Sequence, residues 1–145
     1  MISAIIVDDE EYARGTLRSI LQHFFPEISV IAEADSPVSA IDLLKRTTPD
    51  LVFLDVEMQY GTGFDVLEAL KGFTFQVIFV TAHKELGYKS FRFSAIDYLI
   101  KPVRIAELKE AIEFQGMAIK ASDDGDDEKA LSYVQKALKS RKRLL

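Results

Sequence analysis

Leu51-Val52-Phe53-Leu54-Asp55 places four apolar side chains directly before an acid. An apolar run of this length, with Val and Phe in it, is typical of a strand that is buried on both faces of a parallel sheet. Because a buried carboxylate needs a cation or hydrogen-bond donors, Asp55 is expected to project from the carboxyl edge of that sheet. Open α/β sheets bind their ligands at this edge, so Asp55 is the predicted functional centre.

Four other stretches are expected to be strands, and helices are expected to follow each strand. The predicted strands are 2–7, 28–34, 76–80 and 96–100. The first predicted helix begins at about residue 11 and is ended by Pro26, and the second begins at the cap Ser36-Pro37 and continues past Leu44. The other three are expected over 64–70, over about 85–93 and from about 104 onward. Five strand–helix units in succession predict an α/β protein with a parallel sheet and helices on both of its faces.

The composition narrows the class of protein. The chain has 145 residues, of which 48% are hydrophobic and 28% are charged. It contains two histidines and no cysteine, and the absence of cysteine excludes a disulfide framework or a thiolate metal site. No apolar run approaches a membrane span and the start lacks the basic residues of a signal peptide, so we expect a cytoplasmic protein that does not bind membranes. The net charge of −5 argues weakly against nucleic-acid binding by the chain itself.

The composition changes near Ala121. An acidic block over 123–128 is followed by a basic segment over 136–143. We therefore expect one domain over 1–121, and over 122–145 a mobile acidic linker with a basic helix that buries too little apolar surface to stand alone. The apolar ending at Leu144-Leu145 leads us to expect a truncated chain.

Polar residues stand where four of the five predicted strands end. Asp8 and Asp9 follow the first strand, Asp55 ends the third, Thr81 follows the fourth and Lys101 follows the fifth. The carboxyl ends of parallel strands share one edge, so these side chains are expected to converge. Each also has a plainer interpretation: the first two acids as helix caps, Asp55 as a loop acid, the threonine as a turn residue and the lysine as a solvated one.

The converging residues suit one kind of chemistry. Clustered carboxylates repel each other unless a cation lies between them, and hard oxygen ligands with room for water favour Mg²⁺. The Asp55 carboxylate would then be a nucleophile that forms an acyl phosphate. Lys101 would neutralise the phosphoryl oxygens and Thr81 would donate a hydrogen bond to one of them.

Four motifs resemble the receiver domain of bacterial two-component response regulators, most closely those of the LytTR (LytR/AlgR) type. They are Val7-Asp8-Asp9-Glu10, Phe53-Leu54-Asp55-Val56-Glu57-Met58, Val80-Thr81-Ala82 and Asp97-Tyr98-Leu99-Ile100-Lys101-Pro102. The resemblance covers about residues 1–120. It implies a flavodoxin-like (βα)5 three-layer sandwich with sheet order 2-1-3-4-5.

The resemblance also implies roles for single residues. Asp55 would accept phosphate from a sensor histidine kinase, and Mg²⁺ would be held by Asp8, Asp9, Asp55 and the backbone carbonyl of Glu57. Thr81 and Tyr98 would be the switch pair and Lys101 would contact the phosphoryl group. Glu57 and His83 are candidates for tuning the rate of dephosphorylation. The chain would catalyse only its own phosphorylation and dephosphorylation, and so would not be an enzyme in the ordinary sense.

The resemblance extends to the output of the protein. Phosphorylation would alter the face made by the fourth helix, fifth strand and fifth helix, and so control homodimerisation. DNA would be bound only through an effector domain that is absent from these residues. The charged candidates on that face are Lys89, Arg92, Asp97, Lys109 and Glu113. One departure stands out: the family usually has proline after the methionine of the central loop, where this chain has Gln59, so Mg²⁺ affinity is a point to test.

Three other functions share parts of this pattern. A haloacid-dehalogenase-like phosphatase uses the same residue types but needs an Asp two residues after its nucleophile, where Glu57 stands. A flavodoxin-like flavin binder would need a Ser-, Thr- and Gly-rich loop after the first strand, where acids stand instead. An unphosphorylated receiver used only as an interaction module is the third alternative.

Overall fold

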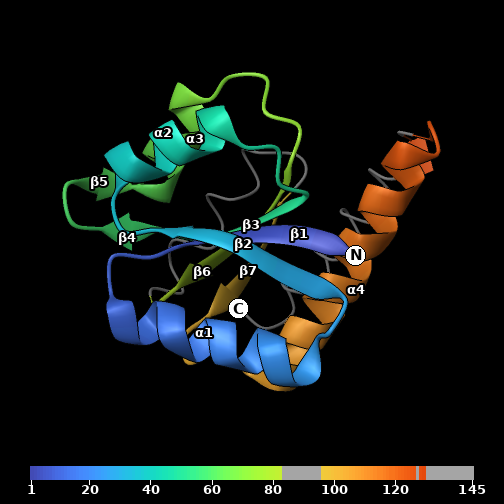
Figure 1. Cartoon of the computed structure of the whole chain (residues 1–145), viewed down its shortest axis with the longest axis horizontal. Coiled ribbons are helices and arrows are strands. Elements are labelled where there is room, and N and C mark those ends of the chain that lie inside the picture. Colours follow the sequence, from blue (N-terminus) through green and yellow to red (C-terminus); the bar gives the residue numbers. More distant parts are fainter. Residues whose placement is uncertain (83–95, 127, 130–145) are drawn as a thin grey trace. The chain divides into compact units, whose positions relative to one another are not determined.

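The computed structural model describes residues 1–82, 96–126 and 128–129 of the 145-residue chain (Figure 1). The chain divides into two compact units, Met1–Phe75 and Gln76–Leu145, and each is described by itself. Among the described residues, no helix has the length and apolarity needed to span a bilayer.

The main sheet has five strands. They are β1 (Ile2–Val7), β2 (Ile28–Ala34), β3 (Leu51–Asp55), β6 (Gln76–Thr81) and β7 (Ile96–Ile100). Their order is β2-β1-β3-β6-β7, and the pairs β1–β2, β1–β3 and β6–β7 are parallel. Since β4 and β5 form a separate small hairpin, this is the predicted order 2-1-3-4-5, and that prediction is confirmed. Strand β2 lies at one edge of the sheet, as that order requires.

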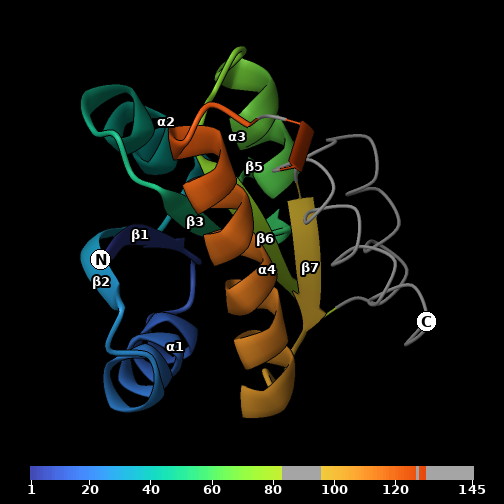
Figure 2. The same ribbon diagram turned by 90° about the vertical axis from the view of Figure 1, so that its right-hand side faces the viewer.

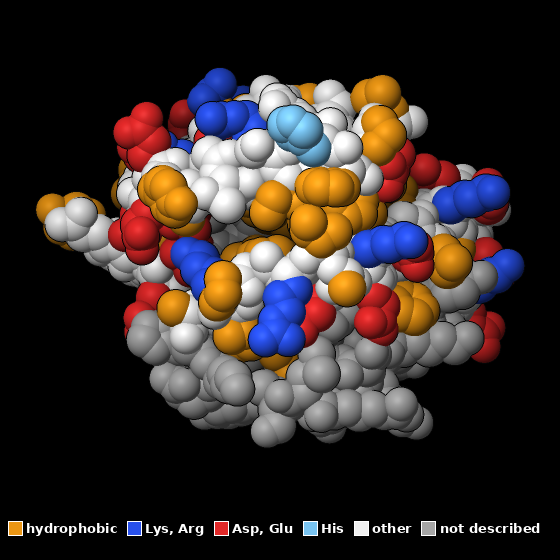
Figure 3. Space-filling model, turned by 90° about the horizontal axis from the view of Figure 1, so that it is seen from below, with side chains coloured by type: hydrophobic (Ala, Val, Ile, Leu, Met, Phe, Trp, Pro, Cys, Tyr) orange, Lys and Arg blue, Asp and Glu red, His pale blue; other side chains and the backbone are white. Residues whose placement is uncertain are grey.

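The first unit has three layers. Helix α1 (Glu11–Phe24) covers one face of strands β1 to β3, while α2 (Pro37–Arg46) and α3 (Gly63–Ala69) cover the other (Figure 1). Residues Leu51–Leu54 of β3 are buried, as a central strand between two helical layers requires. Seen from the side of α1, acidic, basic and apolar side chains are interspersed (Figure 3).

Local capping explains where α2 and α3 begin. The Ser36 hydroxyl accepts a hydrogen bond from the Ser39 N–H at 3.1 Å, and Pro37 follows in the first helical turn, as predicted. The Thr62 hydroxyl accepts from the Asp65 N–H at 3.1 Å and so starts α3 at Gly63, one residue before the expected start. Both caps satisfy backbone donors that have no partner within the helix.

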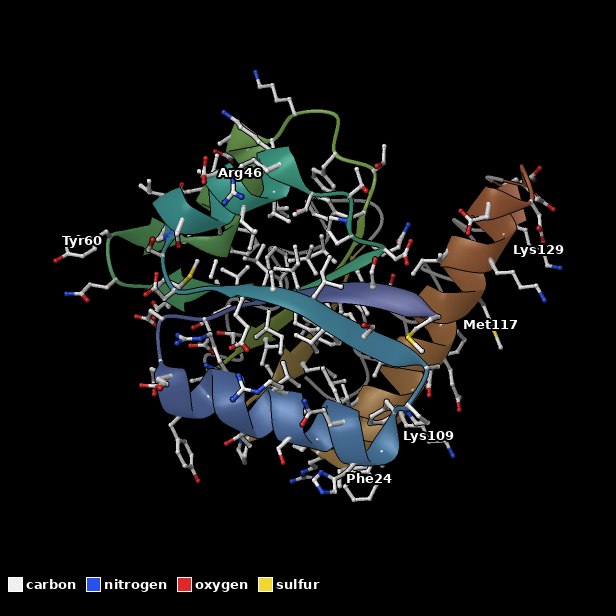
Figure 4. All side chains as sticks on the ribbon, in the orientation of Figure 1. Phe24, Arg46, Tyr60, Lys109, Met117 and Lys129 are labelled. Carbon is white, nitrogen blue, oxygen red and sulfur yellow. The ribbon has the colours of Figure 1, made fainter. Side chains whose placement is uncertain are left out.

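The sequence did not predict the antiparallel hairpin between β3 and α3. It consists of β4 (Glu57–Met58) and β5 (Gly61–Thr62). Two-residue strands are too short to show an alternating pattern, which is why the segment looked like a loop. Tyr60 at its turn has a φ of 71°, and its side chain points outward (Figure 4).

The second unit contains β6, β7 and α4 (Ile105–Asp123), and α4 lies alongside the two strands (Figure 2). The helix begins one residue after the expected position and continues two residues past Ala121. Its inward face includes Leu108, Ile112 and Gln115. The helix expected over 85–93 lies outside the described residues, and so does the part of the expected basic helix that follows residue 129.

Candidate functional site

Three carboxylates meet at the carboxyl edge of the first unit. Strand β1 ends at Val7, so Asp8 and Asp9 follow at once, and Asp55 is the last residue of the neighbouring strand β3. The register that places Val7 opposite Leu54 brings these strand ends together. One oxygen of each acid lies within 4.8 Å of the others, although Asp8 and Asp55 are only 5% and 4% exposed. The structure therefore brings together the three acids that the sequence singled out.

The backbone supplies hydrogen bonds to two of these acids. Oδ1 of Asp8 accepts from the Glu10 N–H at 2.9 Å, and Oδ2 of Asp9 accepts from the Gln59 N–H at 2.9 Å. Donors of this kind offset part of the repulsion between the carboxylates of the cluster. They leave further lone pairs on each carboxylate, so the acids remain able to bind a cation.

The geometry of the cluster fits a small divalent ion. Oxygens bind Mg²⁺ at about 2.1 Å, so ligands on opposite sides of the ion are about 4.2 Å apart. Atoms within 4.8 Å of one another need only a small side-chain adjustment to reach that arrangement. Hard oxygen ligands are also the type that Mg²⁺ prefers over softer donors.

Neither Asp8 nor Asp9 occupies the N-cap position of the helix that follows them. Helix α1 has Glu10 at its N-cap position, and the side chain of Glu10 makes no capping hydrogen bond. The two acids instead accept from Glu10 and Gln59, neither of which lies inside the helix. Asp8 thus bonds to the residue at which α1 begins, and Asp9 bonds to the segment that follows β3.

Thr81 and Lys101 belong to the second unit, and their backbones are hydrogen-bonded to each other. Thr81 is the buried last residue of β6, and its carbonyl accepts from the Lys101 N–H at 2.7 Å. Lys101 follows directly after β7 and is partly exposed. The hydrogen bond extends the β6–β7 pairing by one residue and fixes where the chain leaves β7.

Tyr98 shares a face of the β6–β7 pair with Thr81. The register places Phe79 opposite Tyr98 and Thr81 opposite Ile100. Residues two apart in a strand point to the same face, so the two predicted switch residues lie on the same side of these strands. Tyr98 is buried in this structure.

The remaining predicted residues have mixed outcomes. Glu57 is exposed on β4, while His83, Lys89 and Arg92 lie outside the described residues. Lys109 and Glu113 are exposed on α4. Asp97 was expected among the surface charges, but it is buried, and its Oδ1 accepts from the Tyr98 N–H at 2.7 Å. A strand position that faces the protein interior explains the difference, because the motif around Asp97 does not show which face is covered.

Two contacts at the acidic cluster were not predicted from the sequence. One is the hydrogen bond from the Gln59 N–H to Asp9, and the other runs from the Arg14 guanidinium to the carbonyl oxygen of Asp8 at 2.7 Å. A backbone donor carries no signal in the residue type. An arginine on an amphipathic helix looks like any solvated surface residue.

Comparisons with known proteins all point to the same family. The family model described as the response regulator receiver domain matches residues 4–113. A response regulatory protein of Vibrio cholerae is 34% identical over 114 residues, which cover 78% of this chain and 48% of the relative. The sensory transduction protein LytT of Bacillus subtilis is 35% identical over 115 residues, covering 78% of this chain and 47% of the relative. The chain thus spans about half the length of the curated relatives it matches.

A solved structure shows the same fold. The REC domain of AraT, a response regulator from Geobacillus stearothermophilus, superimposes with a TM-score of 0.74 at 24% identity and covers 84% of this chain and 98% of that one. The strand order and this superposition together identify the flavodoxin-like fold that was expected from the sequence.

Proposed function

The chain belongs to the family of response regulator receiver domains of two-component systems, and we propose that Asp55 accepts a phosphoryl group from a sensor histidine kinase. The observation that carries this proposal is the meeting of Asp8, Asp9 and Asp55 within 4.8 Å. An oxygen of the Asp55 carboxylate attacks phosphorus, the bond from phosphorus to the imidazole nitrogen of the kinase breaks, and an acyl phosphate results. The imidazole leaves with the electron pair of that bond and is protonated.

Asp8, Asp9, Asp55 and the backbone carbonyl of Glu57 are the residues that would hold Mg²⁺. When bound, the ion supplies positive charge that neutralises the phosphoryl oxygens and the carboxylates. The protein's own contribution is to hold the Asp55 carboxylate, buried at the end of β3, beside the other two acids. This arrangement positions the nucleophile before the donor arrives.

Thr81 and Lys101 take the roles that the family resemblance gives them: a hydrogen bond and a positive charge to the phosphoryl group. Their placement at the ends of β6 and β7 supports this assignment. Tyr98, on the same face as Thr81, would change its position when Thr81 is drawn toward the phosphoryl group. The signal would pass to the face that includes Lys109 and Glu113 on α4 and promote homodimerisation.

The matched residues make up only 48% and 47% of the two curated relatives named above, so more than half of each relative lies outside the match. We propose that the additional length corresponds to an effector domain, that DNA is bound only there, and that the protein regulates transcription in the cytoplasm. The described domain would act on no substrate other than itself, with phosphorylation and dephosphorylation both at Asp55. Glu57 and His83 would set the rate of the second reaction.

Incubation with acetyl phosphate and Mg²⁺, followed by intact-mass measurement, tests the proposal. The wild type should gain the mass of one phosphoryl group, and Asp55→Asn should gain none. Asp42→Asn, which changes an exposed acid on α2, is the matched control and should behave like the wild type. A folded wild type that gains no mass would leave the interaction module as the better account.

A further inference from the structure

The edge strand β2 contains one extra residue. Ala4 of β1 pairs with Val30, but the next residue, Ile5, pairs with Ala32, so Ile31 is left over as a bulge. Side chains alternate between faces along a strand, and the extra residue reverses that alternation for the residues after it. Glu33 is therefore opposite Ile6 and lies on the same face as Val30. If Ile31 were paired with β1 instead of bulged, Glu33 would lie on the other face.

The face that Glu33 reaches is the one covered by α1. Arg14 Nε lies 3.3 Å from Glu33 Oε1, and Arg18 NH1 contacts Oε2 of the same carboxylate. The side chain of Arg14 is only 17% exposed, compared with 43% for Arg18. A half-buried ion pair of this kind is less screened by solvent than the exposed pair between Arg46 and Asp42 on α2.

Arg14 also contacts the acidic cluster. Its NH1 donates to the backbone carbonyl of Asp8 at 2.7 Å, while the Asp8 N–H donates to the carbonyl of Ala34 at 3.1 Å. The Asp8 side chain accepts from the Glu10 N–H at 2.9 Å. Both backbone polar groups of Asp8 are thus fixed, one by β2 and the other by an arginine that Glu33 of β2 holds in place.

We infer that Arg14 is a positioning residue for the phosphoryl-acceptor site, and that Glu33 and the bulge at Ile31 hold it there. The inference rests on the proposed function, since it concerns how Asp8 is presented to a divalent ion. A planar guanidinium can bind a carbonyl and a carboxylate at the same time, which a lysine ammonium on a flexible stem does much less well. Partners that orient metal ligands commonly matter about as much as the ligands themselves.

The sign of the effect separates positioning from plain electrostatics. Arg14 is a cation bonded to the backbone of Asp8, one of the three clustered acids, so its charge alone opposes the binding of a second cation. If that charge were its whole influence, Arg14→Ala would tighten Mg²⁺ binding. If Arg14 positions Asp8, the same change weakens Mg²⁺ binding by about 10-fold.

Titration calorimetry with Mg²⁺ on the full chain provides the measurement. We expect Arg14→Ala and Arg14→Lys both to weaken Mg²⁺ binding by about 10-fold, because the lysine keeps the charge but not the double contact. Glu33→Gln should weaken it less, since the arginine loses its anchor but not its bond to Asp8. Arg18→Ala is the matched control: Arg18 contacts Glu33 but has no described contact with Asp8, so Mg²⁺ binding should stay within about twofold.

The outcomes separate this inference from the proposed function. Mg²⁺ affinity that is unchanged or tighter in Arg14→Ala, in a protein that still unfolds cooperatively, overturns the inference alone. A wild type that binds no Mg²⁺ and gains no phosphoryl mass overturns the proposed function as well. If Arg14→Ala does not fold, Arg14→Lys decides the question, because it keeps the length and charge of the side chain.

Discussion

The backbone N–H of Gln59 donates to Oδ2 of Asp9 at 2.9 Å, and so links the acid after β1 to the hairpin that follows β3. The family usually has proline at this position, and proline has no N–H to donate. In this chain the hairpin and the acidic cluster are therefore joined by a bond that the usual residue could not make.

Replacing Gln59 by proline should lower the stability of the metal-free protein. The change removes a hydrogen-bond donor to a carboxylate oxygen at a solvent-exposed site. We therefore expect the free energy of unfolding to be about 1 kcal/mol lower than that of Gln59→Ala, which keeps the N–H. Thermal unfolding in a chelator should show a midpoint about 3–5 °C lower for the proline variant. Equal midpoints for the two variants would mean that the bond contributes nothing measurable.

Tyr60→Gly should stabilise the protein. Tyr60 has a φ of 71° and is 88% exposed, so glycine relieves an unfavourable backbone conformation and sacrifices little burial. We expect the free energy of unfolding, measured with denaturant, to rise by about 0.5–1 kcal/mol, after the greater freedom of glycine in the unfolded chain is included. Tyr12→Gly is the control, for which we expect the opposite sign. Tyr12 is similarly exposed, at 86%, but lies in α1, where replacing tyrosine by glycine should lower the free energy of unfolding by about 0.5 kcal/mol.

Gln115→Leu should also stabilise the protein. Gln115 on α4 is fully buried, and neither its amide nitrogen nor its oxygen has a hydrogen-bond partner within the described structure. Replacing an unpaired buried amide by an apolar side chain of similar size should raise the free energy of unfolding by about 1–2 kcal/mol. The exposed Gln22→Leu on α1 should change it by less than about 0.5 kcal/mol. A destabilised Gln115→Leu would show that the amide is hydrogen-bonded in solution.

Mg²⁺ should stabilise the wild type, and Asp9→Asn should imitate part of that effect. The acids repel one another, so an ion present at about 100 times its dissociation constant should add about 2.7 kcal/mol. Asp9→Asn removes one of the like charges, so its unfolding midpoint in chelator should exceed that of the wild type, and its response to Mg²⁺ should be smaller. NaCl at matched ionic strength controls for screening. An equal Mg²⁺ response in both proteins would contradict the role given to Asp9.

The main sheet and two helix starts could be predicted because each depends on local pattern. The run Leu51–Leu54 is apolar on both faces, and Ser36-Pro37 is a strong start signal whatever surrounds it. The convergence of Asp8, Asp9 and Asp55 could be predicted because the carboxyl ends of parallel strands share one edge of the sheet. The bulge at Ile31, the contact of Arg14 with Asp8 and the burial of Asp97 could not be predicted, because each depends on neighbours that are distant in the sequence.

The extra residue at Ile31 allows β2 to lose one residue without changing which of its side chains face α1. Loss of that one codon would leave Ala32, Glu33 and Ala34 opposite Ile5, Ile6 and Val7, as they are now, and would restore an uninterrupted pairing with β1. An inherited deletion at this point would therefore keep the acid beside the arginines of α1. Homologous genes that lack the codon should still encode an acid opposite the residue equivalent to Ile6.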